Sequence, residues 1–361
     1  MTPYFVLAAA MLPLVAASSL VNGRGGTAAA RWTPWDAVLA LVLITFSGAR
    51  WHVGTDFNAY RSLYLKLPNL DLWTALSVSP YESGFTTLSW IIKNASQTNS
   101  TLPFFMVCAA FTVVPVMISL KLSSPSFGLS MALYVLLGFF AMSMNIVRQG
   151  IAMALLMLAF SLLPRRRFAA VSVAALAVSM HLTAVLVIAI YLASRRLSLR
   201  APTALVAWTG FVAVGFTILR FTDLHGILSR YGGPKYATYL ASEGAGFGTM
   251  LRAALFLVVA LVGLHLATQR ANAPDRLQET ATMVLIGSAL VASGVVVTEV
   301  ARLGDYLVLF AVLVVPMSLT LIRQRALATY AVAVVGIAYF AMVLIAYYGL
   351  IPYAVDPTIT I

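Results

Sequence analysis

Apolar windows recur along the whole chain, and the polar residues gather in the shorter segments between them. Windows of this kind predict helices that cross a membrane. The pattern therefore predicts an all-α fold, a polytopic transmembrane helical bundle. The predicted spans cover about residues 4–21, 36–48, 101–120, 126–144, 148–163, 203–220, 249–268, 281–298, 303–322 and 327–348.

Residues 168–194 form a further apolar run between two basic clusters, 165–167 and 195–200. A single crossing would place one cluster on each face, although basic residues favour the cytoplasmic side. A hairpin of two half-length helices that turns near residues 179–181 puts both clusters on one side, and non-helical backbone is tolerated where protein or a wet cavity surrounds it. We therefore expect a broken or re-entrant hairpin here, and about 10 to 12 membrane segments in all.

Composition excludes an ordinary soluble domain, because the 361 residues are 61% hydrophobic and only 9% charged. The net charge of +12 is expected to be largely topological, so nucleic acid is not an expected partner. The single Cys108 excludes an intramolecular disulfide and a thiol metal cluster. We predict one integral membrane domain, residues 1–361, with outer loops at about 48–100 and 221–248.

Charge is distributed unequally between the two predicted faces. The first apolar run has no basic residue before it, whereas Arg24 and Arg31 follow it, which indicates a retained span with its N-terminus outside. With the hairpin in place, the inner loops carry basic residues that few acidic residues oppose. The outer side mixes basic and acidic residues at span ends, and a functional site is expected there.

The run "SMNIVRQGIAMALLMLAFSLLPRRR" carries Arg148 and Gln149 near one end and three arginines at the other. A helix rises about 1.5 Å per residue, so Arg148 lies roughly 25 Å from Arg165, at the opposite face. Arg148 and Gln149 open the helix, where free N–H groups and the helix dipole favour an anion. This arrangement suits a phosphate group, and the structural alternative is an arginine that reaches toward lipid headgroups.

Two stretches of the first outer loop carry candidate side chains. In "ARWHVGTDFNAYRSLYLKL", a helix after Gly54 would place Arg50, Asp56 and Tyr60 on nearby turns. In "SPYESGFTTLSWIIKN", Glu82 precedes a short amphipathic stretch suited to the membrane interface. The structural alternative is an interfacial belt of aromatic and basic residues.

Two further places carry candidates. His181, at the predicted turn, can transfer a proton or bind a phosphate, and alternatively it binds a freed backbone carbonyl. Late in the chain, Glu299, Arg302, Asp305 and Tyr306 stand at the outer junction of two spans, and Arg302 and Tyr306 share a helical face. An ion pair of Arg302 with Asp305 or Glu299 is the structural alternative. The sequence contains no Asp-x-Asp or His-Glu-x-x-His motif, so no metal site is predicted.

The order of "GTDFNAY", "YESGF", "NIVRQGIAMALLMLAF", "SMHLTAVLVIAIYL" and "EVARLGDYL" resembles the EpsG and Wzy-like family of bacterial polysaccharide polymerases, over about residues 45 to 320. The resemblance implies a Wzy-like, GT-C-like architecture in the bacterial inner membrane. It implies a glycosyltransferase that joins oligosaccharide repeat units carried on undecaprenyl diphosphate, at the periplasmic face, in exopolysaccharide, capsule or O-antigen synthesis. The donor and the acceptor are both lipid-linked glycans, a chain-length regulator is a further candidate partner, and no cofactor is implied.

This chemistry gives the candidate residues distinct roles. The leaving diphosphate needs cations, and Arg148, Arg302 and Arg50 are expected to supply them. The acceptor hydroxyl needs a proton acceptor, and Glu82, Asp56 and His181 are the candidates. The remaining residues predicted to bind substrate are Gln149, Tyr60, Asp305 and Tyr306.

Other functions fit the same composition. A flippase or other transporter of lipid-linked oligosaccharide would also bind a diphosphate, but it should place charges along a path open to both faces, whereas the candidates here crowd the outer side. An O-antigen ligase or a membrane acyltransferase would differ from a polymerase in its product.

Overall fold

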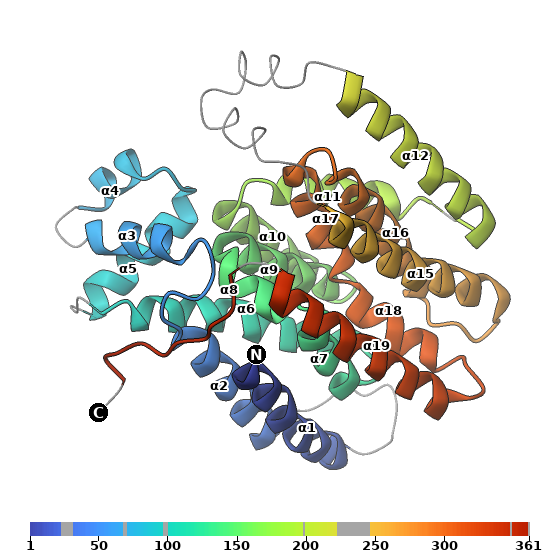
Figure 1. The fold of residues 1–361 in the computed structure, drawn as a ribbon, viewed down its shortest axis with the longest axis horizontal. Coiled ribbons are helices and arrows are strands. Elements are labelled where there is room, and N and C mark those ends of the chain that lie inside the picture. The colour runs from blue at the N-terminus through green and yellow to red at the C-terminus, as the bar shows by residue number, and fades with distance from the viewer. Residues whose placement is uncertain are drawn as a thin grey trace. The chain divides into compact units, whose positions relative to one another are not determined.

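The computed structural model describes residues 1–22, 32–67, 71–96, 100–197, 199–221, 246–346 and 349–359. Within these ranges the regular elements are 17 α-helices and no strand, apart from an isolated bridge between Arg50 and Val355 (Figure 1). The predicted all-α fold is confirmed.

The chain forms two compact units, residues 1–185 with 326–361, and residues 186–325. Helix α11 (Ala184–Ser194) begins in the first unit and continues in the second. The second unit further contains α12 (Ala201–Phe221), α15 (Phe247–Gln269), α16 (Leu277–Ser293), α17 (Thr298–Val308) and α18 (Ala311–Leu319). The first unit contains α1 (Thr2–Asn22), α2 (Pro34–Gly48), α3 (Phe57–Lys66), α4 (Leu72–Val78), α5 (Ser83–Ser96), α6 (Leu102–Ser123), α7 (Phe127–Leu136), α8 (Phe139–Asn145), α9 (Val147–Leu162), α10 (Arg167–Met180) and α19 (Arg325–Ala346).

Several helices are able to cross a membrane. Among the described residues, four are long and apolar enough on their own: Leu102–Ser123, Ala201–Ile218, Gly248–Gln269 and Arg325–Ala346. Two bent pairs, α7 with α8 and α17 with α18, raise the number to six, and further shorter apolar helices accompany them. The chain is therefore a multi-pass membrane protein, and the total of 10 to 12 segments stays a prediction.

Helix α9 is the core of the first unit, where it packs against α6 and α10 (Figure 1). Its side chains are buried on all sides from Gln149 to Ser161, as expected of an apolar helix without a polar face. The helix starts after a break at Ile146, whose φ of −89° and ψ of 58° are not helical. This break sets the position of Arg148 in the first turn.

The predicted hairpin is broken close to the expected turn. Helix α10 ends at Met180 and α11 begins at Ala184, which leaves His181 to Thr183 between them. Helix α10 is longer than the expected half-length helix. It lies along α9, and its end brings His181 to the level of Arg148. The break is confirmed, and the return of the chain to its starting side stays a prediction.

A buried ion pair joins three helices of the first unit. Asp36 of α2 and Lys121 of α6 are 2.9 Å apart, and their side chains are 0% and 3% exposed. Asp36 also accepts hydrogen bonds from Ser18 of α1, at 2.7 Å, and from the hydroxyl and backbone N–H of Thr33, at 2.8 and 2.6 Å. The ion pair links α2 to α6, and the hydrogen bond from Ser18 adds α1 to them.

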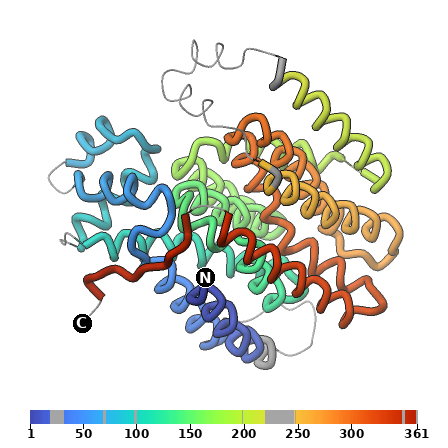
Figure 2. Tube along the Cα trace, in the orientation of Figure 1, coloured from blue at the N-terminus to red at the C-terminus, as the bar shows by residue number. Residues whose placement is uncertain are grey.

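The segment after α19 lies against the beginning of the first outer loop (Figure 2). The backbone N–H of Trp51 donates to Ala354 at 2.8 Å, and that of Asp356 donates to Ala49 at 2.7 Å. Close by, the hydroxyl of Tyr4 in α1 donates to the carbonyl of Leu350 at 2.8 Å. The start of α1, the end of α2 and the segment after α19 therefore meet.

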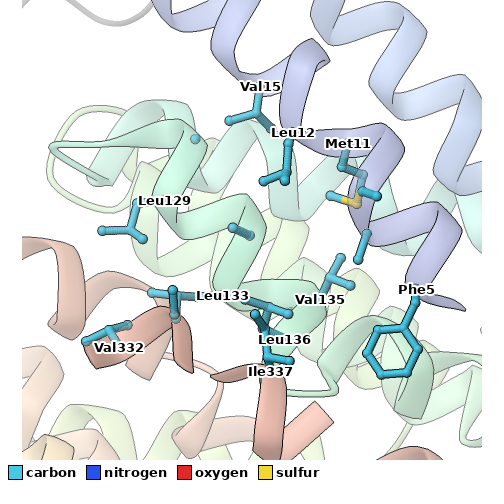
Figure 3. Close-up of a pocket in the computed structure, with 15 residues that line it drawn as sticks. Phe5, Met11, Leu12, Val15, Leu129, Leu133, Val135, Leu136, Val332 and Ile337 are labelled. Carbon is cyan, nitrogen blue, oxygen red and sulfur yellow. The ribbon is translucent and has the colours of Figure 1, made fainter. Parts of the chain in front are cut away.

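An apolar cavity of about 520 Å³ lies between α1, α7 and α19 (Figure 3). Its lining includes Phe5 and Leu12 of α1, Leu133 and Leu136 of α7 and Ile337 of α19. The lining residues have no polar side chain that could bind a sugar or a phosphate. The polar residues predicted to form the site are not part of this lining.

Candidate functional site

Arg148 reaches from the first turn of α9 to the first outer loop. Its guanidinium donates to Oε2 of Glu82, and its Cζ lies 4.2 Å from the ring centroid of Tyr81. The buried Nε of Arg148 has no hydrogen-bond partner among the described residues. Arg148 is therefore held by a charge and an aromatic face.

Glu82 binds His181 as well as Arg148. Nδ1 of His181 lies 2.8 Å from Oε1 of Glu82, and the backbone N–H of Leu182 donates to the same oxygen at 3.3 Å. An ionised carboxylate only accepts hydrogen bonds, so Nδ1 carries a proton, and in the neutral form of the ring Nε2 has a lone pair.

The pKa of Glu82 reflects these contacts. Burial raises it, but the hydrogen bond with His181 and the charge of Arg148 outweigh burial and bring the pKa down to about 2. Glu82 is therefore ionised at neutral pH and is a weak proton acceptor. It is better suited to orienting Arg148 and His181.

Tyr60 and Asp56 lie beside this group. Tyr60 of α3 is buried against the rings of Tyr81 and Phe85, at centroid distances of 5.9 and 5.7 Å. Burial raises its pKa to about 12, although the charge of Arg148 opposes this and that of Asp56 adds to it. Tyr60 is therefore a neutral hydroxyl. We call Arg148, Glu82, His181, Tyr60 and Tyr81 the Arg148 cluster.

The cluster combines four residues that were predicted from the sequence to belong to the site and one that was not. Arg148, Glu82, His181 and Tyr60 come from four separate stretches and meet in the first unit. Tyr81 was missed, although its place in "YESGF" directly before Glu82 was a usable signal.

Two other candidates lie deeper in the first unit. Gln149 is buried in α9, with its Nε2 3.9 Å from the sulfur of Met153. Arg50 is 2% exposed, and its guanidinium donates to the carbonyls of Ser47 and of Met144, the latter at 2.9 Å. The contacts of Arg50 hold the ends of α2 and α8 together, and a substrate role for Arg50 or Gln149 stays a prediction.

The late candidates form a separate group in the second unit. Arg302 lies 3.4 Å from Glu299, which is one of the two ion pairs expected as the structural alternative. Asp305 is instead buried and pairs with Arg252 of α15, a residue that was not a candidate. Tyr306 is also buried. Arg148 belongs to the first unit and Arg302 to the second, and a joint diphosphate site of the two residues stays a prediction.

Residues 222–245, which make up most of the second predicted outer loop, lie outside the described residues. The residues that are described contain no group of three or more His, Cys, Asp or Glu side chains able to hold a metal ion.

Gly84 allows α5 to approach α10 at the cluster. A Cβ at this position would lie 2.3 Å from the hydroxyl oxygen and 2.7 Å from the backbone oxygen of Ser179, two residues before His181. The glycine of "YESGF" therefore brings Glu82 within reach of His181.

Replacing Gly84 by alanine should separate α5 from α10 at this point and stretch the contact between Glu82 and His181. We expect a loss of about 1–3 kcal/mol in the free energy of unfolding, as for other overpacked contacts. Unfolding in detergent measures it, with Gly210→Ala in α12 as the matched control because a Cβ there meets nothing within 4 Å. An unchanged stability for Gly84→Ala would show that this contact tolerates a side chain.

Comparison with known families bears directly on this arrangement. The model of the EpsG family matches residues 35–355, nearly the whole chain and every candidate residue above. The chain belongs to the EpsG family. The EpsG family is the Wzy-like polysaccharide polymerase family, so the resemblance inferred from the motifs is confirmed. Searches of curated proteins and of solved structures give no match.

Proposed function

We propose that this EpsG-family protein is a membrane glycosyltransferase that polymerises oligosaccharide repeat units linked to undecaprenyl diphosphate. A hydroxyl of one lipid-linked unit attacks the anomeric carbon of the glycan on another, and undecaprenyl diphosphate leaves. The observation that carries the proposal is the shared engagement of Glu82 by Arg148 and His181 at the N-terminal end of α9.

The cluster supplies what the leaving group requires. As the bond from the anomeric carbon to the diphosphate oxygen breaks, negative charge grows on that oxygen. The guanidinium of Arg148 and the first N–H groups of α9 offer donors and positive charge to it. Burial strengthens this stabilisation, because Arg148 is only 15% exposed.

The cluster also offers a proton acceptor. Nε2 of His181 takes the proton of the acceptor hydroxyl while the hydroxyl oxygen bonds to the anomeric carbon. Glu82 keeps the proton on Nδ1 before the step and stabilises the imidazolium that forms, as a carboxylate does for a catalytic histidine. Glu82 is thus a positioning residue, and His181 takes the role of base for which Glu82 and Asp56 were alternatives.

The remaining candidates are assigned to substrate binding. Asp56 and Tyr60 border the cluster and suit sugar hydroxyls. A substrate role for Arg302 and Asp305 of the second unit stays a prediction. We place the site at the periplasmic face of the inner membrane, because the unopposed basic residues mark the other face.

The test is turnover of purified protein in lipid nanodiscs on lipid-linked repeat units. A ladder of products that grows by whole repeat units, with release of undecaprenyl diphosphate, is the expected result, and His181→Ala should reduce it strongly. Movement of the substrate across vesicles without growth of the glycan would instead favour a flippase. Transfer to a lipid core would favour a ligase, and transfer of an acyl group an acyltransferase.

A further inference from the structure

Asn145 links the first outer loop to the start of α9. It is the last residue of α8 and is 3% exposed. Its Oδ1 accepts hydrogen bonds from the hydroxyl of Thr55 at 2.9 Å and from the backbone N–H of Asp56 at 3.0 Å. The N–H of Asp56 can only donate, so the orientation of the amide is determined.

The turn that Asn145 binds is shaped for this contact. Gly54 has a φ of +95°, in the left-handed region that favours glycine. A Cβ there would lie 3.2 Å from Oδ1 of Asn145 and 3.4 Å from the carbonyl oxygen of Met144. Both the conformation and the space at Gly54 therefore favour a residue without a side chain, which lets the turn reach Asn145.

The helix end that carries Asn145 is itself fixed. Arg50 donates to the carbonyl of Met144 at 2.9 Å and to that of Ser47, so its charge lies at the C-terminal ends of α8 and α2. The negative ends of two helix dipoles stabilise a buried cation. Arg50 also stacks on Phe105, with Cζ 4.3 Å from the ring centroid, and no salt bridge is found for it among the described residues.

Residues at the break between α8 and α9 thus hold two parts of the first outer loop. Asn145 binds the turn that begins α3, and Arg148, three residues later, binds Glu82 before α5. Helix α3 carries Tyr60, on which the charges of both Asp56 and Arg148 act. The distance from Asp56 and Tyr60 to Arg148 therefore depends on the bonds of Asn145.

We propose that Asn145 is a positioning residue, which holds the Gly54–Asp56 turn in place so that Asp56 and Tyr60 face the substrate bound at Arg148. The inference rests on the proposed function for its effect on turnover. It predicts that turnover depends on the hydrogen bonds accepted by Oδ1 of Asn145, and not on the size of the side chain alone.

The test compares Asn145→Leu with Asn145→Asp in the full-length protein. Leucine removes the acceptor, whereas aspartate keeps an acceptor oxygen toward the turn. Hydrogen exchange at the Asp56 amide should become faster in the leucine variant and stay close to the parent in the aspartate variant. In the polymerisation assay, Asn145→Leu should lower kcat about 10- to 100-fold, while the KM for the donor changes little because Arg148 is retained.

Two further comparisons separate positioning from general damage. Thr55→Val removes one of the two bonds and should lower kcat, whereas Thr55→Ser keeps the hydroxyl and should not. Asn58→Leu makes the same substitution at an exposed position of α3 and should change neither measurement.

The outcomes are distinct. The inference is overturned if hydrogen exchange at the Asp56 amide is unchanged in Asn145→Leu. It is also overturned if that exchange becomes faster while kcat is unchanged. If the parent protein does not polymerise, the proposed function fails, and hydrogen exchange then decides alone whether Asn145 holds the turn.

Discussion

Replacing Arg148 by alanine should lower the kcat of polymerisation about 100- to 1,000-fold, the loss seen when one donor to a developing oxyanion is removed. The variant loses the guanidinium that faces Glu82 and Tyr81 at the start of α9. The leaving diphosphate would then develop its charge in a largely buried site without that cation. The rate of chain growth on lipid-linked repeat units, measured with saturating substrate, checks this expectation.

Two variants serve as controls for Arg148→Ala. Arg148→Lys keeps the charge but loses the planar fork of donors, so an intermediate rate is expected. Arg166→Ala removes an exposed arginine beyond the other end of α9 and should leave the rate unchanged. If Arg148→Ala, shown to be folded by its unfolding profile, extends glycans as fast as the parent, the site has been placed wrongly.

Replacing Asp36 by asparagine should lower the free energy of unfolding by about 3–5 kcal/mol, because it removes the carboxylate that pairs with the charged and buried Lys121. Asparagine has nearly the shape of aspartate, so the change acts mainly through charge. The rings of Phe127 and Trp32, 4.4 and 5.5 Å from Nζ of Lys121, compensate only in part. Unfolding in mixed micelles measures the difference.

The double variant Asp36→Asn with Lys121→Met tests the cause of that loss. It removes both charges, so it should recover much of the stability, as the replacement of other buried ion pairs by apolar residues does. A double variant no more stable than Asp36→Asn alone would assign the loss to the hydrogen bonds of Asp36 with Ser18 and Thr33.

The helices were largely predictable from local features of the sequence. Hydropathy located the long spans, and a helix after Gly54 and a short amphipathic helix after Glu82 are present as α3 and α5. Helix α4 was not predicted, although Asp71 accepts a hydrogen bond from the N–H of Thr74 as an N-cap. Short helices of this kind depend on one capping residue and leave little trace in hydropathy.

The contacts of the site were predictable only in part. The sequence placed Arg148 and Glu82 on one side of the membrane, because side is set by hydropathy and charge, and it placed His181 at the turn of the hairpin. It did not pair them, since Arg148 and Glu82 are 66 residues apart and His181 and Glu82 are 99 apart. Such pairs depend on how α5, α9 and α10 pack, which in turn depends on close contacts such as that of Gly84 with Ser179.

The hydrogen bond between Tyr4 and Leu350 constrains how the chain threads the bilayer. Two segments in direct contact lie on the same side, so the chain between the start of α1 and the end of α19 must traverse the lipid an even number of times. The ten spans expected outside residues 168–194 already satisfy this parity. If each of them traverses once, the chain through α10 and α11 has to return to the side from which it entered, whatever the depth of its bend.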